Sequence, residues 1–218
     1  MKEKVLCPFI FPEMERTNFI DAIREHGPKF GLDISDTSVE CLAGYYELVQ
    51  KYNPLLHLVG PCSAEEFAIR HILESLSLLR HLPVNSKFVD VGAGAGLPSI
   101  PCLIVRDDVR ATLIESKEKK ANFLNAAIVE LGLHERASVI NRQFEETSPG
   151  DAEFVTCRAL DKFSEKLPRL LKWSKGRKLL LFGGPNLKEA LQTNRVAFYE
   201  RLIPLSDQRF LYVSKTAR

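Results

Sequence analysis

The feature that most constrains the fold is a change of hydrophobic period near residue 87. Beyond it, short apolar runs typical of strands alternate with longer helical patterns. The strand-like runs lie at 87–92, 111–116, 137–141, 153–158 and 178–183. Apolar strands separated by helices predict a parallel sheet with helices on both of its faces, so the sequence indicates the α/β class.

Two further strand-like runs, 196–203 and 208–214, are separated by a short polar turn. This spacing predicts a hairpin, so the last strand should run antiparallel to its neighbours. We therefore expect a Rossmann-like sheet of seven strands.

The part before residue 84 carries helical patterns only. Residues 36–53 place apolar side chains at helical spacing, and Pro54 predicts that this helix ends at Asn53. The stretch Ser63-Ala-Glu-Glu66 is a capping-box pattern that opens a further helix. These helices should pack on the sheet domain.

The chain of 218 residues with 45% hydrophobic content is long enough for one domain with a substantial core. We expect a helical extension at 1–83 and a Rossmann-like domain at 84–218. No apolar run approaches the about 20 residues that span a bilayer, and the N-terminal stretch lacks the long apolar segment of a signal peptide. These features predict a soluble, cytoplasmic protein.

The cysteines are scattered and odd in number, with no Cys-x-x-Cys pair and no histidine at ligand spacing. They are Cys7, Cys41, Cys62, Cys102 and Cys157. We expect reduced, mostly buried thiols and no metal site.

The stretch FVDVGAGAGLPSIP (88–101) breaks a buried strand with glycines at alternate positions. Gly92, Gly94 and Gly96 allow a sharp turn close to a ligand, and the following helix would direct free N–H groups at it. The dinucleotide fingerprint requires its third glycine at 97, where this chain has Leu97. The pattern therefore favours S-adenosylmethionine over NAD.

Asp90 lies two residues before this turn, at the end of the same strand. A buried carboxylate there is costly unless a cationic or hydrogen-bonding group meets it. A pyrophosphate would be repelled, whereas the ammonium of a methionine moiety would be stabilised. The alternative is that Asp90 only caps turn amides.

Polar residues also follow the next two strands. Glu115 lies where the ribose hydroxyls of either cofactor would need an acceptor. Gln143 and Phe144 lie where an adenine would be bound, so Gln143 or its backbone could bond the base edge and Phe144 could cover its face. A core phenylalanine beside a polar loop is the alternative for Phe144.

Charge is unevenly distributed along the chain. Residues 1–83 carry 8 Lys+Arg against 12 Asp+Glu, a net of −4, and residues 84–218 carry 22 against 16, a net of +6. The helical pattern at 162–175 places its basic residues on one side, and these are Lys162, Lys166, Arg169 and Lys172. This face could follow RNA phosphates or simply be solvated, and Pro168 should bend or delay the helix.

With these motifs in place, most of the chain resembles the bacterial 16S rRNA guanine-N7 methyltransferases of the glucose-inhibited division protein B type. The resemblance rests on the glycine motif with its Leu-Pro and on five further motifs. They are His71-Ile-Leu-Glu-Ser75, Asp90-Val-Gly-Ala-Gly-Ala-Gly-Leu-Pro-Ser-Ile-Pro101, Glu115-Ser116, Arg142, Arg158-Ala159 and Arg209-Phe210-Leu211.

The resemblance implies a class I methyltransferase fold that uses S-adenosylmethionine to methylate a guanine of 16S rRNA, as free RNA or in the small subunit. It implies no DNA or membrane partner, and we expect a monomer. The residues expected at the cofactor are Asp90, Gly92, Gly94, Gly96, Leu97, Glu115, Gln143, Phe144 and Arg158. Arg158, Arg209 and His71 are candidates for the substrate side, although His71 on its mostly apolar face could instead be a core histidine.

Guanine N7 carries a free lone pair and no proton, so its methylation needs no general base and no catalytic acid–base residue is expected. Alignment of N7 with the methyl group and exclusion of water lower the barrier. A donor to guanine O6 and positive charge at neighbouring phosphates would support this alignment.

Four positions depart from the family pattern. Phe182 replaces a lysine expected beside the active site, His57-Leu58-Val59 replaces Asn-Leu-Thr, Glu74 replaces an aspartate, and Phe144 replaces an acidic residue. The missing lysine leaves open a non-catalytic relative that binds RNA or the ribosome. A small-molecule methyltransferase and an NAD oxidoreductase are the less favoured alternatives.

Overall fold

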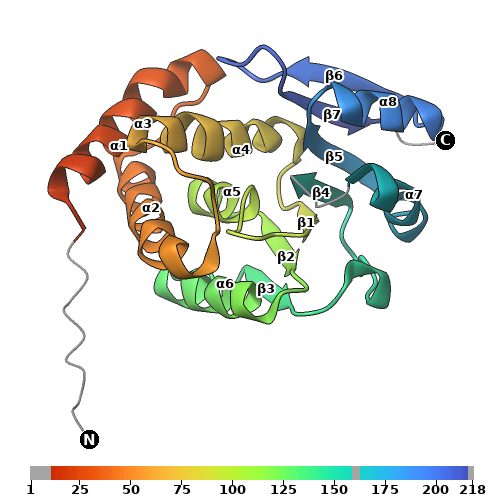
Figure 1. Cartoon of the computed structure of the whole chain (residues 1–218), viewed down its shortest axis with the longest axis horizontal. Helices are drawn as coiled ribbons and strands as arrows, with labels where there is room; N and C mark the ends of the chain where they lie inside the picture. The colour runs from red at the N-terminus through yellow and green to blue at the C-terminus, as the bar shows by residue number, and fades with distance from the viewer. Residues whose placement is uncertain (1–10, 159–162, 216–218) are drawn as a thin grey trace, which may run out of the picture.

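A computed structural model describes residues 11–158 and 163–215 of the protein. Seven strands form one sheet in the order β3-β2-β1-β4-β5-β7-β6 (Figure 1). The strands are β1 (Lys87–Val91), β2 (Arg110–Ile114), β3 (Ala137–Ile140), β4 (Phe154–Arg158), β5 (Lys178–Gly183), β6 (Phe198–Leu202) and β7 (Phe210–Ser214). The first five strands pair in parallel, and β7 is antiparallel to both β5 and β6, which confirms the predicted Rossmann-like sheet and its final hairpin.

Helices cover both faces of the sheet because successive strand residues point to opposite sides. In β1, Phe88 belongs to one apolar cluster and Val89 to the other. The first cluster includes side chains of the N-terminal helices, of α5 (Ser99–Val105) and of α6 (Glu118–Glu130). The second includes side chains of α7 (Phe163–Trp173) and α8 (Pro185–Thr193). A short 3₁₀ turn, η4 (Phe144–Glu146), follows β3.

A helical extension precedes β1 and packs on the first face, where α2 contacts α5 and α6. Its elements are α1 (Glu13–His26), η1 (Gly27–Phe30), α2 (Asp36–Leu56), α3 (Ala64–Phe67), η2 (Ala68–Leu73), α4 (Glu74–Leu76) and η3 (Ser77–His81). The last four run on without a break, and η2 is a π-helical turn. The division into 1–83 and 84–218 as separate units stays a prediction.

The predicted helix boundaries are partly right. Ser63 and Glu66 form the expected capping box, in which each side chain accepts the other residue's backbone N–H. The predicted end of α2 at Asn53 is wrong, because Pro54 lies inside the last turn and the helix continues to Leu56. It ends at His57, which adopts the left-handed conformation and donates its backbone N–H to the Asn53 carbonyl.

Helix α7 has the expected two sides. Leu167 and Leu170 are buried, whereas Arg169 and Lys172 are exposed, and Pro168 lies within the helix. Lys162, Ala159 and Cys7 lie outside the described residues. Of the other cysteines, Cys102 and Cys157 are buried, Cys62 is half-buried and Cys41 is exposed. Within the described ranges, no helix is long and apolar enough to cross a membrane.

One buried hydrogen bond joins the helical extension to the glycine turn of the sheet domain. The Tyr45 hydroxyl of α2 donates to the Ala95 carbonyl at 2.8 Å, and the Tyr45 side chain is fully buried. Burial raises the pKa of this hydroxyl far above its usual range, so it remains a donor.

We predict that Tyr45→Phe lowers the free energy of unfolding by about 1–2 kcal/mol, because it leaves the Ala95 carbonyl buried without a donor. Urea denaturation measures this loss. Tyr46→Phe is the matched control, since the Tyr46 hydroxyl makes only a longer, partly exposed bond of 3.3 Å to Glu15. Equal losses in the two variants would contradict the assignment.

Candidate functional site

A cavity of about 410 Å³ opens at the carboxyl ends of β1, β2 and β4. Open α/β sheets bind ligands at this edge, where loops leave the strands. The lining residues are Leu58, Val59, Gly60, His71, Gly92, Ala93, Gly94, Ala95, Leu97, Glu115, Ser116, Lys117, Lys120, Arg158 and Lys166. The sheet domain and the helical extension therefore both contribute to its wall.

The glycine turn forms one wall as the sequence predicts. Gly92, Gly94 and Gly96 all have positive φ, at 74°, 57° and 91°, which L side chains rarely adopt. Gly92 and Gly94 line the cavity, whereas a side chain at Gly96 would collide with Ile100 of α5. Gly96 therefore serves the packing of the helix against the turn.

Glu115 follows β2 and is placed by two backbone groups. Its Oε2 accepts the Gly94 N–H at 3.0 Å and its Oε1 accepts the Lys117 N–H at 2.8 Å. The side chain is only 6% exposed and lines the cavity. A carboxylate oxygen can accept more than one hydrogen bond, so Glu115 can hold the turn and still accept from ligand hydroxyls.

Asp90 lies under the glycine turn and is fully buried. Its Oδ2 accepts from the Ser99 hydroxyl at 2.6 Å, whereas its Oδ1 meets no donor within the described residues. Burial raises the pKa of Asp90 to about 7, against the opposing effect of the Ser99 hydrogen bonds. The residue is not in the cavity wall itself, but an unpaired buried oxygen requires a partner.

Gln143 and Phe144 do not reach the cavity. Gln143 is exposed, and Phe144 is buried with its ring edge-on to that of Trp173 in α7, 5.7 Å between centroids. Neither residue lines the cavity, and their contacts with an adenine stay a prediction. The buried position agrees with the alternative of a core phenylalanine.

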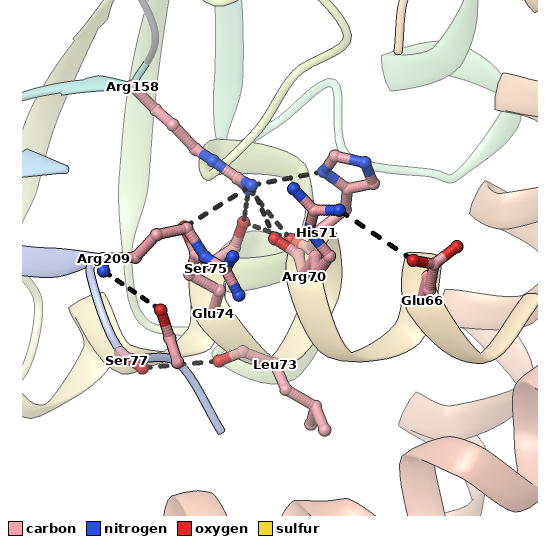
Figure 2. Close-up of polar contacts among 10 residues, drawn as sticks. Glu66, Arg70, His71, Leu73, Glu74, Ser75, Ser77, Arg158 and Arg209 are labelled. Atoms are coloured by element: carbon pink, nitrogen blue, oxygen red, sulfur yellow. Dashed lines mark hydrogen bonds and ion pairs between the residues drawn. The ribbon is translucent and has the colours of Figure 1, made fainter. Parts of the chain in front are cut away.

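Arg158 ends β4 and points at the helix that carries the π turn (Figure 2). Its Nη1 donates to the His71 carbonyl at 3.3 Å and to the Ser75 hydroxyl at 3.2 Å, and its Nη2 donates to the Arg70 carbonyl. A π turn displaces carbonyls from the regular α-helical ladder, which leaves them available to such a donor. This set of donors fixes the end of β4 to the helical extension.

Glu74 lies between two arginines from distant parts of the chain. It is 3% exposed, its Oε2 accepts from Arg209 Nε at 2.7 Å, and its Oε1 lies 3.5 Å from Arg158 Nη2. The sequence analysis missed this role. The available signal was an acidic residue inside a buried apolar helix, which requires a cationic partner.

The three predicted substrate-side residues thus converge on one helix. His71 and Arg158 line the cavity, whereas Arg209 lies behind Glu74 and outside the wall. His71 Nδ1 lies 3.2 Å from Arg158 Nη2, and the ring packs edge-on against Phe67. Burial and the neighbouring arginines, Arg158 first, lower the pKa of His71 to about 3.

Lysines form the outer part of the cavity wall. Lys117, Lys120 and Lys166 all line it, and Lys120 Nζ lies 3.3 Å from the His57 carbonyl. The loop from Leu58 to Gly60 faces them, a contribution that the sequence analysis did not predict. Its Val59 N–H donates to the Asn53 side chain at 3.0 Å, which ties the loop to the end of α2.

Phe182 occupies the position where the resemblance implies a lysine. It pairs in register with Arg158 on β4 and with Leu211 on β7, and it is buried in the first apolar cluster. Phe182 itself supplies no cation at this point of the sheet, and its register neighbour Arg158 brings positive charge to the inner wall.

The arrangement can hold a nucleoside through Glu115 and a cationic group above Asp90, with positive charge on the opposite wall. The family model of the GidB family, described as rRNA small subunit methyltransferase G, matches residues 38–212.

Among curated proteins, ribosomal RNA small subunit methyltransferase G of Neisseria meningitidis is 37% identical over 135 residues, which are 62% of this chain and 65% of the relative. The match to these first relatives thus spans just under two thirds of their length. The protein of the same name from Chromobacterium violaceum is 34% identical over 158 residues, which are 71% of this chain and 75% of the relative.

Solved structures share the fold at low identity. The Bacillus subtilis tRNA methyltransferase TrmK superposes with a TM-score of 0.53 at 17% identity, over 66% of this chain and 65% of that one. The mitomycin 7-O-methyltransferase MmcR superposes with a TM-score of 0.57 at 13% identity, over 93% and 68%. The sheet is thus that of the class I methyltransferases, and the match over residues 38–212 shows that the chain belongs to the GidB family of rRNA small subunit methyltransferase G proteins.

Proposed function

We propose that the protein transfers a methyl group from S-adenosylmethionine to N7 of a guanine in 16S rRNA. The observation that carries the proposal is the cavity at the strand ends, which the glycine turn and Glu115 line and beneath which Asp90 is buried. Membership of the GidB family supplies the class of substrate, since the relatives are named for small-subunit ribosomal RNA. We place the activity in the cytoplasm, where this RNA is made and assembled.

The residues present fit this cofactor. The unpaired Asp90 Oδ1 needs a donor, which an ammonium group can provide directly or through water. Glu115 can accept from ribose hydroxyls, and Gly92 and Leu97 offer a wall that a nucleoside can approach closely. The cofactor would supply an electrophilic methyl group on its sulfonium centre.

The contribution of the chain is orientation rather than acid–base chemistry. Guanine N7 attacks with its own lone pair, so no residue has to remove a proton. The helical extension lines the cavity through loop 58–60 and His71, and in our proposal these residues exclude water from the reacting groups. Because the product base is cationic, positive side chains are better placed at phosphates than against the ring.

The lysines of the cavity wall are suited to contacts with RNA phosphates. Lys117 precedes α6, Lys120 lies on α6 and Lys166 lies on α7, and all three line the one cavity. In our proposal they contact backbone phosphates on either side of the target guanine, and the protein acts as a monomer on naked rRNA or on the small subunit. Arg209 supports the inner wall through Glu74.

The transfer reaction tests the proposal directly. We predict that the purified protein, labelled S-adenosylmethionine and small subunits or 16S rRNA from cells lacking the protein give label at one guanine, as 7-methylguanosine. The modified nucleotide is mapped by chemical cleavage at that base. Tight cofactor binding with no label transferred would contradict the enzymatic function and favour a binding protein.

We further predict that Glu115→Gln weakens the binding of S-adenosylhomocysteine about 10- to 100-fold. The amide N–H₂ would face the backbone N–H of Gly94 or Lys117, which is already a donor, and one acceptor for ligand hydroxyls would be lost. Titration calorimetry measures the Kd. Glu118→Gln, at an exposed position three residues further on, is the matched control and should leave the Kd unchanged. Parallel losses in both variants would exclude Glu115 as a cofactor ligand.

A further inference from the structure

The tautomer of His71 is determined by its neighbour. Arginine has only N–H donors, so the contact of 3.2 Å between Arg158 Nη2 and His71 Nδ1 requires Nδ1 to be the acceptor. A neutral imidazole that accepts at Nδ1 carries its proton on Nε2. The ring is therefore a donor on its far side only.

The environment keeps this ring neutral. Arg158, Arg70 and Arg209 all oppose protonation electrostatically, and burial adds to their effect. The carboxylate of Glu74 has its oxygens directed at Arg158 and Arg209, and that of Glu66 pairs with Arg70. The imidazole therefore stays neutral in the ordinary pH range and keeps its single proton on Nε2.

The free nitrogen is available to a ligand. Figure 2 shows the second ring nitrogen of His71 turned away from Arg158. The residue lines the cavity, and Nε2 has no acceptor within residues 11–158 and 163–215. Packing of the ring edge-on against Phe67, at 5.0 Å between centroids, holds its plane. The result is an oriented, uncharged N–H group in the wall.

We propose that His71 is the residue that selects guanine, by donating Nε2–H to O6 of the target base. The inference rests on the proposed function. The Hoogsteen edge of guanine presents two acceptors, N7 and O6, whereas adenine presents N7 and an N6 amino donor. A ring fixed as a donor matches O6 and meets the adenine amino group donor to donor.

An uncharged donor also suits the reaction. Methylation at N7 gives the base a positive charge, and a cationic side chain at O6 would oppose that charge as it develops. A cofactor carboxylate would also accept from Nε2, but the charged guanidinium of Arg158, which lines the same cavity, matches it better. These two points favour the base over the cofactor as the partner of Nε2.

Three variants distinguish two roles of His71, recognition of the base and positioning of Arg158. His71→Asn keeps an oxygen where Nδ1 accepts from Arg158 but has no far-side donor. His71→Gln can return an N–H to the Nε2 position, and His71→Phe keeps only the ring. We expect kcat/KM for unmethylated 16S rRNA to fall roughly 10-fold or more in the Asn and Phe variants, with partial recovery in the Gln variant.

The matched control is His81→Phe, because His81 is half-buried against Tyr199 and outside the cavity wall. It should leave kcat/KM unchanged, and the Kd for S-adenosylhomocysteine should stay within about twofold of wild type in all four variants. Recovery by His71→Asn rather than His71→Gln would reduce His71 to a support for Arg158. A loss of S-adenosylhomocysteine affinity that matches the loss of kcat/KM would assign Nε2 to the cofactor, and either result overturns the proposal.

The base is tested by 2-aminopurine, which keeps N7 and lacks O6, placed by splinted ligation at the mapped position of the rRNA. The ratio of kcat/KM for the guanine RNA to kcat/KM for the 2-aminopurine RNA should be about 10-fold larger for wild type than for His71→Phe. Equal preferences would overturn the proposal. Wild type that methylates neither RNA would instead refute the proposed function, so the two failures are distinguishable.

The tautomer has a readout that does not depend on activity. Long-range proton–nitrogen correlation spectra of the protein with ¹⁵N-labelled histidine, assigned with His71→Asn, report which ring nitrogen carries the proton. We expect His71 to show Nε2–H and an unprotonated Nδ1, unchanged between pH 8 and about 5.5, since its pKa lies near 3. A proton on Nδ1, or titration within this range, would contradict the proposal.

Discussion

The buried carboxylate of Glu74 is the interaction on which the site depends. A charge that is 3% exposed is stable only when it is paired, and Glu74 is paired on both oxygens. Its partners end β4 and precede β7, 84 and 135 residues further along the chain. One side chain of the helical extension therefore fixes two separate strands of the sheet at the edge where the cavity lies.

Other contacts extend this connection to the cavity wall. Arg158, which is paired with Glu74, donates to the Arg70 and His71 carbonyls of the π turn and determines the tautomer of His71. On the other side of the glycine turn, Tyr45 holds the Ala95 carbonyl. The helical extension is thus part of the site, since it orients both the turn that would meet the cofactor and the ring that would meet the base.

Features that depend on local sequence could be predicted, whereas features that depend on contacts between distant segments could not. The glycine turn, Asp90 and Glu115 are placed by their position at the ends of strands, and strand ends can be read from local pattern. The direction of the Phe144 ring could not be read in this way. It depends on Trp173 of α7, which lies beyond the next strand in sequence and contacts the Phe144 ring in the core.

The pairing of Glu74 with two arginines and the loop from Leu58 to Gly60 could not be read from the sequence either. Both depend on how the helical extension lies against the sheet, which no local pattern specifies. The family resemblance did mark His71, Arg158, Arg209 and the acidic position of Glu74, but not the pairing of Glu74 with the two arginines. A double-mutant cycle tests the ion pair between Glu74 and Arg209 most directly. The variants Glu74→Leu, Arg209→Leu and the double variant are compared with wild type by urea denaturation. The account predicts that Glu74→Leu alone costs about 3–5 kcal/mol and that the double variant costs at least about 1 kcal/mol less than the sum of the two single variants. Additivity within about 0.5 kcal/mol would contradict it.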